Sequence, residues 1–302
     1  MATQPDNQHG SSRTTAAAGR SLHIGLNFVD PGHYNGWDGE LNACEYDLRD
    51  MAALAKSAGF DTTTLIRQQA TRANVLSAFG DAAAALRAGD IFLVTYSGHG
   101  GQLPDYSGDE VDAIDETWCL FDGQLIDDEL FECWQKFAEG VRIFVISDSC
   151  HSGSVFRKAR GLKLEPSTVT DTDGQDWGEK PRAMPAAVGA ETYRNNRAQY
   201  DGLQDELYQR GWKKPGMERT VPVDASVRLF SGCRDDQYSF DGVANGHFTE
   251  RLLRVWRGGR FDGDYEAFHD AIVSQMRADQ TSQHSRLGKA DPAYDGQNPF
   301  II

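Results

Sequence analysis

Short apolar segments alternate with amphipathic ones along the first half of the chain. Four apolar or β-branched segments predict strands, at residues 22–29, 60–66, 91–96 and 141–147. Residues 41–58 carry apolar side chains at helical spacing, and Thr71 is placed to cap a second helix that ends near Arg87, before Gly89. An acidic loop region and a helix near residues 128–137 follow. Alternating strands and helices predict an α/β fold, in which helices cover both faces of a mainly parallel sheet.

The second half of the chain divides into a polar segment and a shorter patterned one. Residues 157–220 contain four prolines and 12 of the 30 Lys and Arg residues, so they predict a long mobile connector with a short helix near 191–210. Residues 226–231 predict another strand, and helices near 247–257 and 265–276 follow it. We therefore expect this last part to complete the sheet.

This pattern predicts a single folded domain over residues 21–302, preceded by a disordered leader over residues 1–20. Within the domain, we expect a large first part over 21–156, the connector over 157–220 and a small last part over 221–302.

Charge and composition narrow the classes of function. The chain has 45 acidic against 30 basic residues and a formal charge of −15, which disfavours binding to nucleic acid. It has neither an apolar run long enough to cross a membrane nor an apolar segment of the kind found in a signal peptide, so we expect no membrane partner. Five irregularly spaced cysteines indicate free thiols in a reducing compartment, and hence a cytoplasmic protein.

Two predicted strands end in residues that can carry nucleophilic chemistry. One runs into Ser97-Gly98-His99-Gly100-Gly101 and the other into Asp148-Ser149-Cys150-His151-Ser152-Gly153. Active sites of α/β sheets lie beyond the carboxyl ends of strands, so Cys150 is the expected nucleophile and His99 its general base and acid. Backbone N–H groups of Gly100 and Cys150 could form an oxyanion hole. A buried structural thiol and a core histidine are the alternatives, and each is weaker once the two motifs occur together.

These two motifs resemble those of the metacaspases, a family of caspase-like cysteine peptidases. Residues 41–48, 71–75 and 127–130 also resemble the family, and residues 231–237 and 246–249 do so weakly. The resemblance implies the caspase-hemoglobinase fold, a three-layer α/β/α sandwich around a mainly parallel sheet. It also implies an endopeptidase that cleaves after Arg or Lys.

The resemblance further implies which residues bind the basic side chain before the cleaved bond, the P1 residue. The matching residues are Cys44, Asp47, Ser97 and Asp148. A pocket for an acidic P1 residue needs a nearby cation. Residues 88–135 and 143–156, which contain the two motifs, hold no Lys or Arg, and this argues against cleavage after an acidic residue. Asp47 as a solvated helix residue and Asp148 as a turn cap are the alternatives.

A metal site is a further expectation. Residues 88–135 hold 12 acidic side chains, and hard cations such as Ca²⁺ take several carboxylate oxygens. The resemblance implies Ca²⁺ binding by Asp115, Asp127 and Asp128, although this chain is shorter than the family pattern between Asp115 and Asp127. A solvated acidic face and a helix cap at Asp127 or Asp128 are the other interpretations.

The expected partners are protein or peptide substrates with a basic P1 residue. Because the connector holds several basic residues, we also expect the enzyme to cut itself there and the two pieces to stay associated. The resemblance alone implies a monomer. Two alternatives stay open: a non-catalytic caspase-like module that binds calcium or a partner, and a peptidase of the same fold with a non-basic P1 preference.

Overall fold

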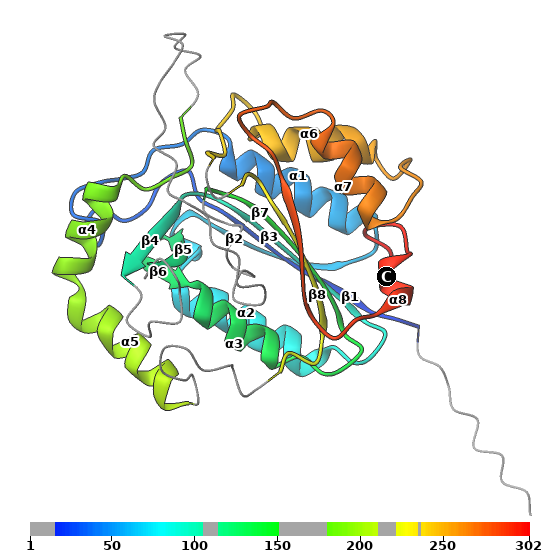
Figure 1. The fold of residues 1–302 in the computed structure, drawn as a ribbon, viewed down its shortest axis with the longest axis horizontal. Helices are drawn as coiled ribbons and strands as arrows, with labels where there is room; N and C mark the ends of the chain where they lie inside the picture. The colour runs from blue at the N-terminus through cyan, green and yellow to red at the C-terminus, as the bar shows by residue number, and fades with distance from the viewer. Residues whose placement is uncertain (1–15, 105–113, 151–179, 211–221, 235–236) are drawn as a thin grey trace, which may run out of the picture.

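A six-stranded sheet forms the centre of the computed structural model (Figure 1). The structure describes residues 16–104, 114–150, 180–210, 222–234 and 237–302. The strands lie in the order β2-β1-β3-β7-β8-β9, and only β9 runs antiparallel to its neighbour. Their bounds are β1 Gly19–Gly25, β2 Asp61–Ile66, β3 Ile91–Ser97, β7 Arg142–Asp148, β8 Ser226–Ser231 and β9 Gln283–Gly288. The expected mainly parallel sheet is confirmed.

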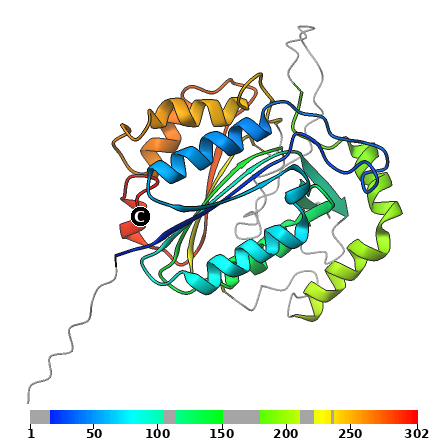
Figure 2. The same ribbon diagram turned by 180° about the vertical axis from the view of Figure 1, so that it is seen from behind.

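Helices cover both faces of this sheet, which gives three layers (Figures 1 and 2). On one face, α1 (Cys44–Ser57), α6 (His247–Trp256) and α7 (Tyr265–Val273) share one apolar core with the sheet. On the other face, α2 (Arg72–Ala85) and α3 (Asp127–Gln135) share a second core with it. A 3-10 turn, η1 (Arg67–Gln69), and a short helix, α8 (Pro292–Asp295), complete these layers. None of the helices in the described segments is both long and apolar enough to cross a bilayer.

Local sequence features explain where these elements begin and why they are buried. The Thr71 hydroxyl accepts a hydrogen bond from the Asn74 N–H at 3.2 Å, so it caps α2 as predicted. Every residue of β3 and β7 is buried, which explains their continuous apolar sequences. The two strands pair in parallel, with Ser97 opposite Asp148, so their carboxyl ends meet at one edge of the sheet.

The predicted acidic loop region contains a second, three-stranded antiparallel sheet. Its strands are β4 (Gly100–Pro104), β5 (Ile114–Leu120) and β6 (Gly123–Ile126). The prediction of a loop was therefore wrong for these residues. The acidic side chains of β5 masked its strand pattern: Asp115 and Glu116 are buried beside the apolar Trp118.

Much of the predicted connector is folded against the rest of the domain. Residues 180–210 contain α4 (Ala186–Asn195) and α5 (Arg197–Gln209), where a single short helix was predicted. The α5 side chains Tyr200 and Leu207 are buried in the core that α2 and α3 share with the sheet. Residues 157–179 and 211–220 of the connector lie outside the described residues. At the amino terminus, β1 begins at Gly19, inside the predicted leader.

Leu207→Ala tests whether this segment is part of the folded core. Leu207 is 4 % exposed, so we expect its truncation to lower the free energy of unfolding by about 2–5 kcal/mol. Denaturant unfolding of full-length Cys150→Ala protein measures this difference without self-cleavage. Gln199→Ala, at an exposed α5 position, is the matched control and should change little. Equal stability of the two variants would contradict this assignment.

Candidate active site

The two predicted catalytic motifs meet where β3 and β7 end. His99 follows β3, and Cys150 follows β7, its paired neighbour in the sheet. Gly100 lies so close to Cys150 that a Cβ atom at position 100 would come within 1.8 Å of the Cys150 carbonyl oxygen. Glycine is therefore required at position 100 for the two loops to approach each other.

The imidazole of His99 is held in one orientation and one tautomer. Its Nε2 lies 2.9 Å from the Gly39 carbonyl oxygen, and because a carbonyl only accepts, Nε2 carries the proton. The Trp37 ring packs against it with the ring centroids 4.7 Å apart. Burial lowers the pKa of His99 to about 4, so the ring is neutral at neutral pH. Nδ1 is buried, and no residue of the described segments forms a hydrogen bond with it, so it is available to accept a proton.

The Cys150 side chain contacts the backbone of Ser239. The Ser239 N–H donates to Cys150 Sγ at 3.1 Å, and the thiol is buried. All five cysteines are free, in agreement with the predicted thiols.

The chain itself occupies this site, with Arg182 between the two loops. The backbone N–H groups of Gly100 and Cys150 both donate to the Arg182 carbonyl oxygen, at 2.9 and 3.1 Å. These are the two N–H groups that the sequence predicted as an oxyanion hole. Two N–H groups that converge on one carbonyl oxygen are placed to stabilise negative charge on that oxygen.

Residues 180–184 run through the site in an extended conformation. Pro181 forms an antiparallel bridge with Phe240, and the Arg182 N–H donates to the Ser239 carbonyl at 2.8 Å. On the far side of Arg182, the Met184 N–H donates to the Gly100 carbonyl at 2.8 Å. Main-chain pairing of this kind is how an extended peptide adds to an exposed backbone edge.

The Arg182 guanidinium is wholly buried in a pocket of carboxylates. Its nitrogens lie 2.7 Å from Asp47, 3.0 Å from Asp148 and 3.0 Å from Asp241, and it donates to the Ser97 hydroxyl at 2.9 Å. Burial disfavours the charged form of Arg182, but the nearby acidic groups outweigh this effect and raise its pKa. The pocket is therefore built for a basic side chain.

Hydrogen bonds from several elements hold the carboxylates of this pocket in place. Asp148 accepts from the Ser239 hydroxyl at 2.6 Å and from the Thr249 hydroxyl at 2.6 Å. Asp47 accepts from Ser97 at 2.7 Å and from the Gly246 N–H at 3.0 Å. Both carboxylates, like Asp241 with the N–H groups of Asn42 and Ala43, therefore have neutral donors in addition to the guanidinium, which reduces the cost of burying the charge.

The structure brings together the four residues that the resemblance assigned to the P1 pocket. Asp47, Ser97 and Asp148 bind Arg182 directly. Cys44 is buried beside them, and burial raises the pKa of its thiol. Sequence reasoning missed Asp241, because an aspartate before Gly242 looks like an ordinary turn residue.

Sequence reasoning also missed Gly246, which forms a wall of the pocket. A Cβ atom at this position would lie 2.5 Å from Cζ of Arg182, so the guanidinium fits only because residue 246 is glycine. Its position directly before a predicted helix was the one signal in the sequence, and that position is common for a glycine.

The three predicted calcium ligands lie in two elements, β5 and α3. Asp127 and Asp128 begin α3, and Asp115 in β5 accepts a hydrogen bond from Gln204 Nε2 at 2.6 Å. In the described part of the chain, no three His, Cys, Asp or Glu side chains are arranged to hold a metal ion. Residues 105–113, which include further acids of this stretch, lie outside the described residues. Calcium binding therefore stays a prediction.

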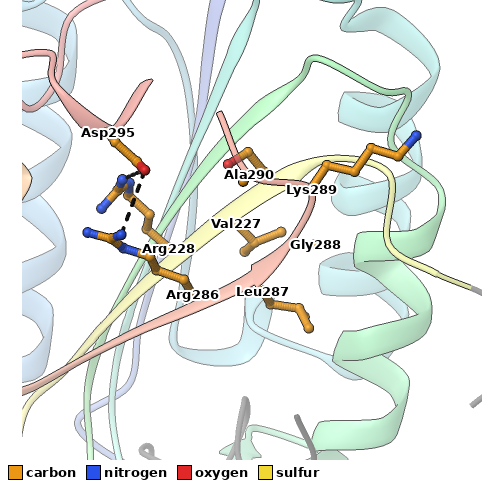
Figure 3. A pocket seen from close by; sticks show the side chains of 9 residues that line it. Val227, Arg228, Arg286, Leu287, Gly288, Lys289, Ala290 and Asp295 are labelled. Atoms are coloured by element: carbon orange, nitrogen blue, oxygen red, sulfur yellow. Dashed lines mark ion pairs between the residues drawn. The ribbon is translucent and has the colours of Figure 1, made fainter. Parts of the chain in front are cut away.

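A separate hollow lies between β8, β9 and α8 (Figure 3). Its basic side chains Arg228 and Arg286 both form ion pairs with Asp295, and Lys289 pairs with Glu139 and Asp224. These cations are already compensated within the chain. The hollow lies near the amino end of β8, at the opposite end of the sheet from Cys150.

Comparison with known proteins agrees with this arrangement. The family model described as the caspase domain matches residues 28–295. The chain belongs to the caspase domain family. It is 30 % identical over 248 residues to metacaspase-1A of Neurospora crassa, a match that covers 74 % of this chain and 52 % of that protein. It is 31 % identical over 259 residues to metacaspase-1 of Emericella nidulans, covering 76 % of this chain and 59 % of the relative. The chain spans only 52 % and 59 % of the length of these two relatives.

Two solved structures resemble this caspase domain. A protein of Geobacter sulfurreducens is 49 % identical with a TM-score of 0.79, and the match covers 94 % of this chain and 99 % of that one. Caspase-1 of Spodoptera frugiperda is 9 % identical with a TM-score of 0.52, covering 94 % and 93 % of the two chains. The second match concerns the fold alone, and it confirms the predicted caspase-like architecture.

The buried carboxylate of Asp47 predicts a pH dependence of stability. Burial raises its pKa from 3.8 to about 6, against the opposing effect of Arg182. A raised pKa means that the folded chain holds this proton more tightly than the unfolded chain does. Asp47 therefore contributes stability at low pH that is lost as the pH rises from about 4 to about 6.

Denaturant unfolding of Cys150→Ala protein between pH 4 and pH 7 measures this contribution, with the double variant Cys150→Ala, Asp47→Asn beside it. Because asparagine does not titrate, the double variant should lose this part of the slope of stability against pH. Parallel curves for the two proteins would show that the pKa of Asp47 is not raised.

Proposed function

We propose that this caspase domain is a cysteine endopeptidase that cleaves after a basic P1 residue, arginine above all, and that its first substrate is its own Arg182–Ala183 bond. The observation that carries the proposal is the position of Arg182. Its carbonyl oxygen accepts from the N–H groups of Gly100 and Cys150, while its guanidinium is bound by Asp47, Asp148 and Asp241. A peptide bond held in this way is positioned as a substrate.

The residues of the site supply each step of the reaction. His99 Nδ1 accepts the thiol proton, and Cys150 Sγ attacks the Arg182 carbonyl carbon. Negative charge develops on the carbonyl oxygen, where the N–H groups of Gly100 and Cys150 stabilise it. The carbon–nitrogen bond to Ala183 then breaks as His99 returns the proton to the departing nitrogen. Water attacks the resulting thioester with His99 again as base, which frees the Arg182 carboxylate and regenerates Cys150.

The pocket chemistry favours arginine over lysine. The guanidinium places separate nitrogens against different oxygen acceptors: Nη1 contacts Ser97 and Asp148, and Nη2 contacts Asp47 and Asp241. A lysine ammonium is a single point of charge and cannot span the same acceptors at once. Lysine should therefore be accepted at a lower rate.

N-terminal sequencing of the incubated full-length protein tests the proposal. We expect a new chain that begins at Ala183 and no cleavage of Cys150→Ala. Arg182→Gln should slow the cut at this bond about 100-fold or more, since it removes a buried charge from its partners. Arg182→Lys should cut more slowly than the wild type but faster than Arg182→Gln.

Lys180→Gln is the matched control, because it removes a basic side chain two residues away that is largely exposed. It should cut after Arg182 at nearly the wild-type rate. A wild-type sample that stays intact and cleaves no peptide with P1 Arg, Lys, Asp or Asn would favour the non-catalytic module. Activity on the Asp or Asn peptide would favour the same fold with a non-basic P1 preference.

Gly246→Ala tests the pocket from the enzyme side. Because the added methyl group would lie 2.5 Å from Cζ of Arg182, we expect it to displace the guanidinium and slow cleavage after arginine about 100-fold. The measurement is kcat/KM on a fluorogenic P1-Arg peptide, together with the rate of self-cleavage. Gly80→Ala is the control, since a Cβ atom there meets no atom within 4 Å. Wild-type rates for Gly246→Ala would place the P1 side chain elsewhere.

Calcium activation is a further part of the proposal, through Asp115, Asp127 and Asp128. The same peptide assay with millimolar Ca²⁺ or with a chelator tests it, and equal rates in both would reject it. A monomeric state and a cytoplasmic location also stay predictions.

A further inference from the structure

The residue two positions after Arg182 occupies a second, apolar pocket. Met184 is 7 % exposed and packs with three other buried side chains, Val29, Tyr34 and Cys119. The partly buried side chains of Trp37, next to the catalytic His99, and of Val188 in α4 complete this cluster. A cleaved peptide therefore meets the enzyme on both sides of the bond that breaks.

The walls of this pocket are held in place independently of Met184. The Tyr34 hydroxyl donates to the Leu120 carbonyl at 2.8 Å, and Cys119 lies within β5. Gly101 forms the floor: a Cβ atom there would lie 2.8 Å from the methyl carbon of Met184. Most of the pocket thus belongs to the part of the domain that precedes Cys150 in the chain.

The main chain fixes which residue of a substrate enters this pocket. The Met184 N–H donates to the Gly100 carbonyl, and Gly100 also supplies an N–H to the Arg182 carbonyl oxygen. One glycine therefore sets the register on both sides of the Arg182–Ala183 bond. With a basic side chain in the carboxylate pocket, the second residue after the cleaved bond is directed into the apolar pocket.

We propose that this enzyme selects protein substrates with an apolar, methionine-like residue at the second position after the cleaved bond, P2′, through the pocket formed by Val29, Tyr34, Trp37, Gly101 and Cys119. The inference rests on the proposed cleavage after arginine. A charged P2′ side chain would be buried here with no charged partner among the described residues that line the pocket, which is costly. An apolar side chain gains the free energy of burial.

A third contact on the other side of the bond is expected to matter less. Lys180, at P3, pairs with Glu40 at 2.9 Å, but the two side chains are 45 % and 72 % exposed. Exposed ion pairs contribute little to binding, so P3 serves as an internal control for the P2′ pocket.

The test uses internally quenched peptides and the self-processed Met184→Gly enzyme, whose own chain leaves the apolar pocket empty. The reference peptide contains Lys-Pro-Arg-Ala-Met, and three others replace its Met by Leu, its Met by Glu or its Lys by Ala. We expect the Met and Leu peptides to have similar kcat/KM values, and the Glu peptide to be roughly 10- to 100-fold slower. The change of Lys to Ala should alter kcat/KM by only a few-fold.

A fluorogenic reporter that ends at P1 Arg, and so has no P2′ residue, separates this inference from the proposed function. Cleavage of the reporter together with equal rates on the Met and Glu peptides would overturn the P2′ pocket and leave the peptidase intact. No cleavage of the reporter or of any peptide would overturn both. In the full-length protein, Met184→Glu should slow self-cleavage and Met184→Leu should not, and the reverse result would also contradict the inference.

Discussion

The buried ion cluster around Arg182 is the interaction on which the rest of the site depends. Three carboxylates surround one guanidinium with no exposure to solvent. Such a cluster is tolerated only where further donors satisfy each oxygen, and those donors come from separate elements. Asp241 accepts from the N–H groups of Asn42 and Ala43 at the start of α1. The cluster thus ties α1, the start of α6 and the ends of β3 and β7 into one unit.

The same cluster determines which charge the pocket can accommodate. Without Arg182, three acids would face one another in a buried space, and like charges raise the cost of ionisation. The pKa of Asp47 is raised to about 6 mainly by burial, and the charge of Asp148 raises it further. A bound cation lowers the cost of ionising these buried acids, and a bound anion raises it. Under the proposed function, selectivity for basic side chains would follow from how the domain packs, since the acids that bind Arg182 also connect the helices to the ends of the central strands.

The sequence predicted the parts of this structure that depend on local pattern. Continuous apolar runs identified β3 and β7, and the rule for the carboxyl ends of parallel strands placed His99 beside Cys150. The resemblance supplied Cys44, Asp47, Ser97 and Asp148, which do meet in one pocket. The small sheet β4-β5-β6 escaped detection because its acids are buried by tertiary contacts that no local pattern records.

Long-range contacts account for what the sequence could not supply. Asp241 and Gly246 lie almost 200 positions from the α1 residues that they contact, Ala43 and Asp47, and nothing in their own neighbourhood marks them. Arg182 was one of several basic residues in a polar segment. Its role is visible only in the folded chain, where the Arg182 carbonyl oxygen accepts from the N–H groups of Gly100 and Cys150. Conversely, the proline and charge content of 157–220 obscured two helices that bury Tyr200 and Leu207.

The anchoring of α4 has a kinetic consequence for the bond that precedes it. This helix begins at Ala186, the fourth residue after the Arg182–Ala183 bond, and its Thr192 is wholly buried. If the proposed cleavage occurs, the amine released at Ala183 stays only a few residues from the thioester on Cys150, at a high effective concentration. It competes with water as a nucleophile, and its attack would rebuild the peptide bond. Under the proposed mechanism, the intact chain and the acyl-enzyme interconvert until water hydrolyses the thioester. The net rate of processing therefore depends on how far the new amino terminus at Ala183 moves away from Cys150.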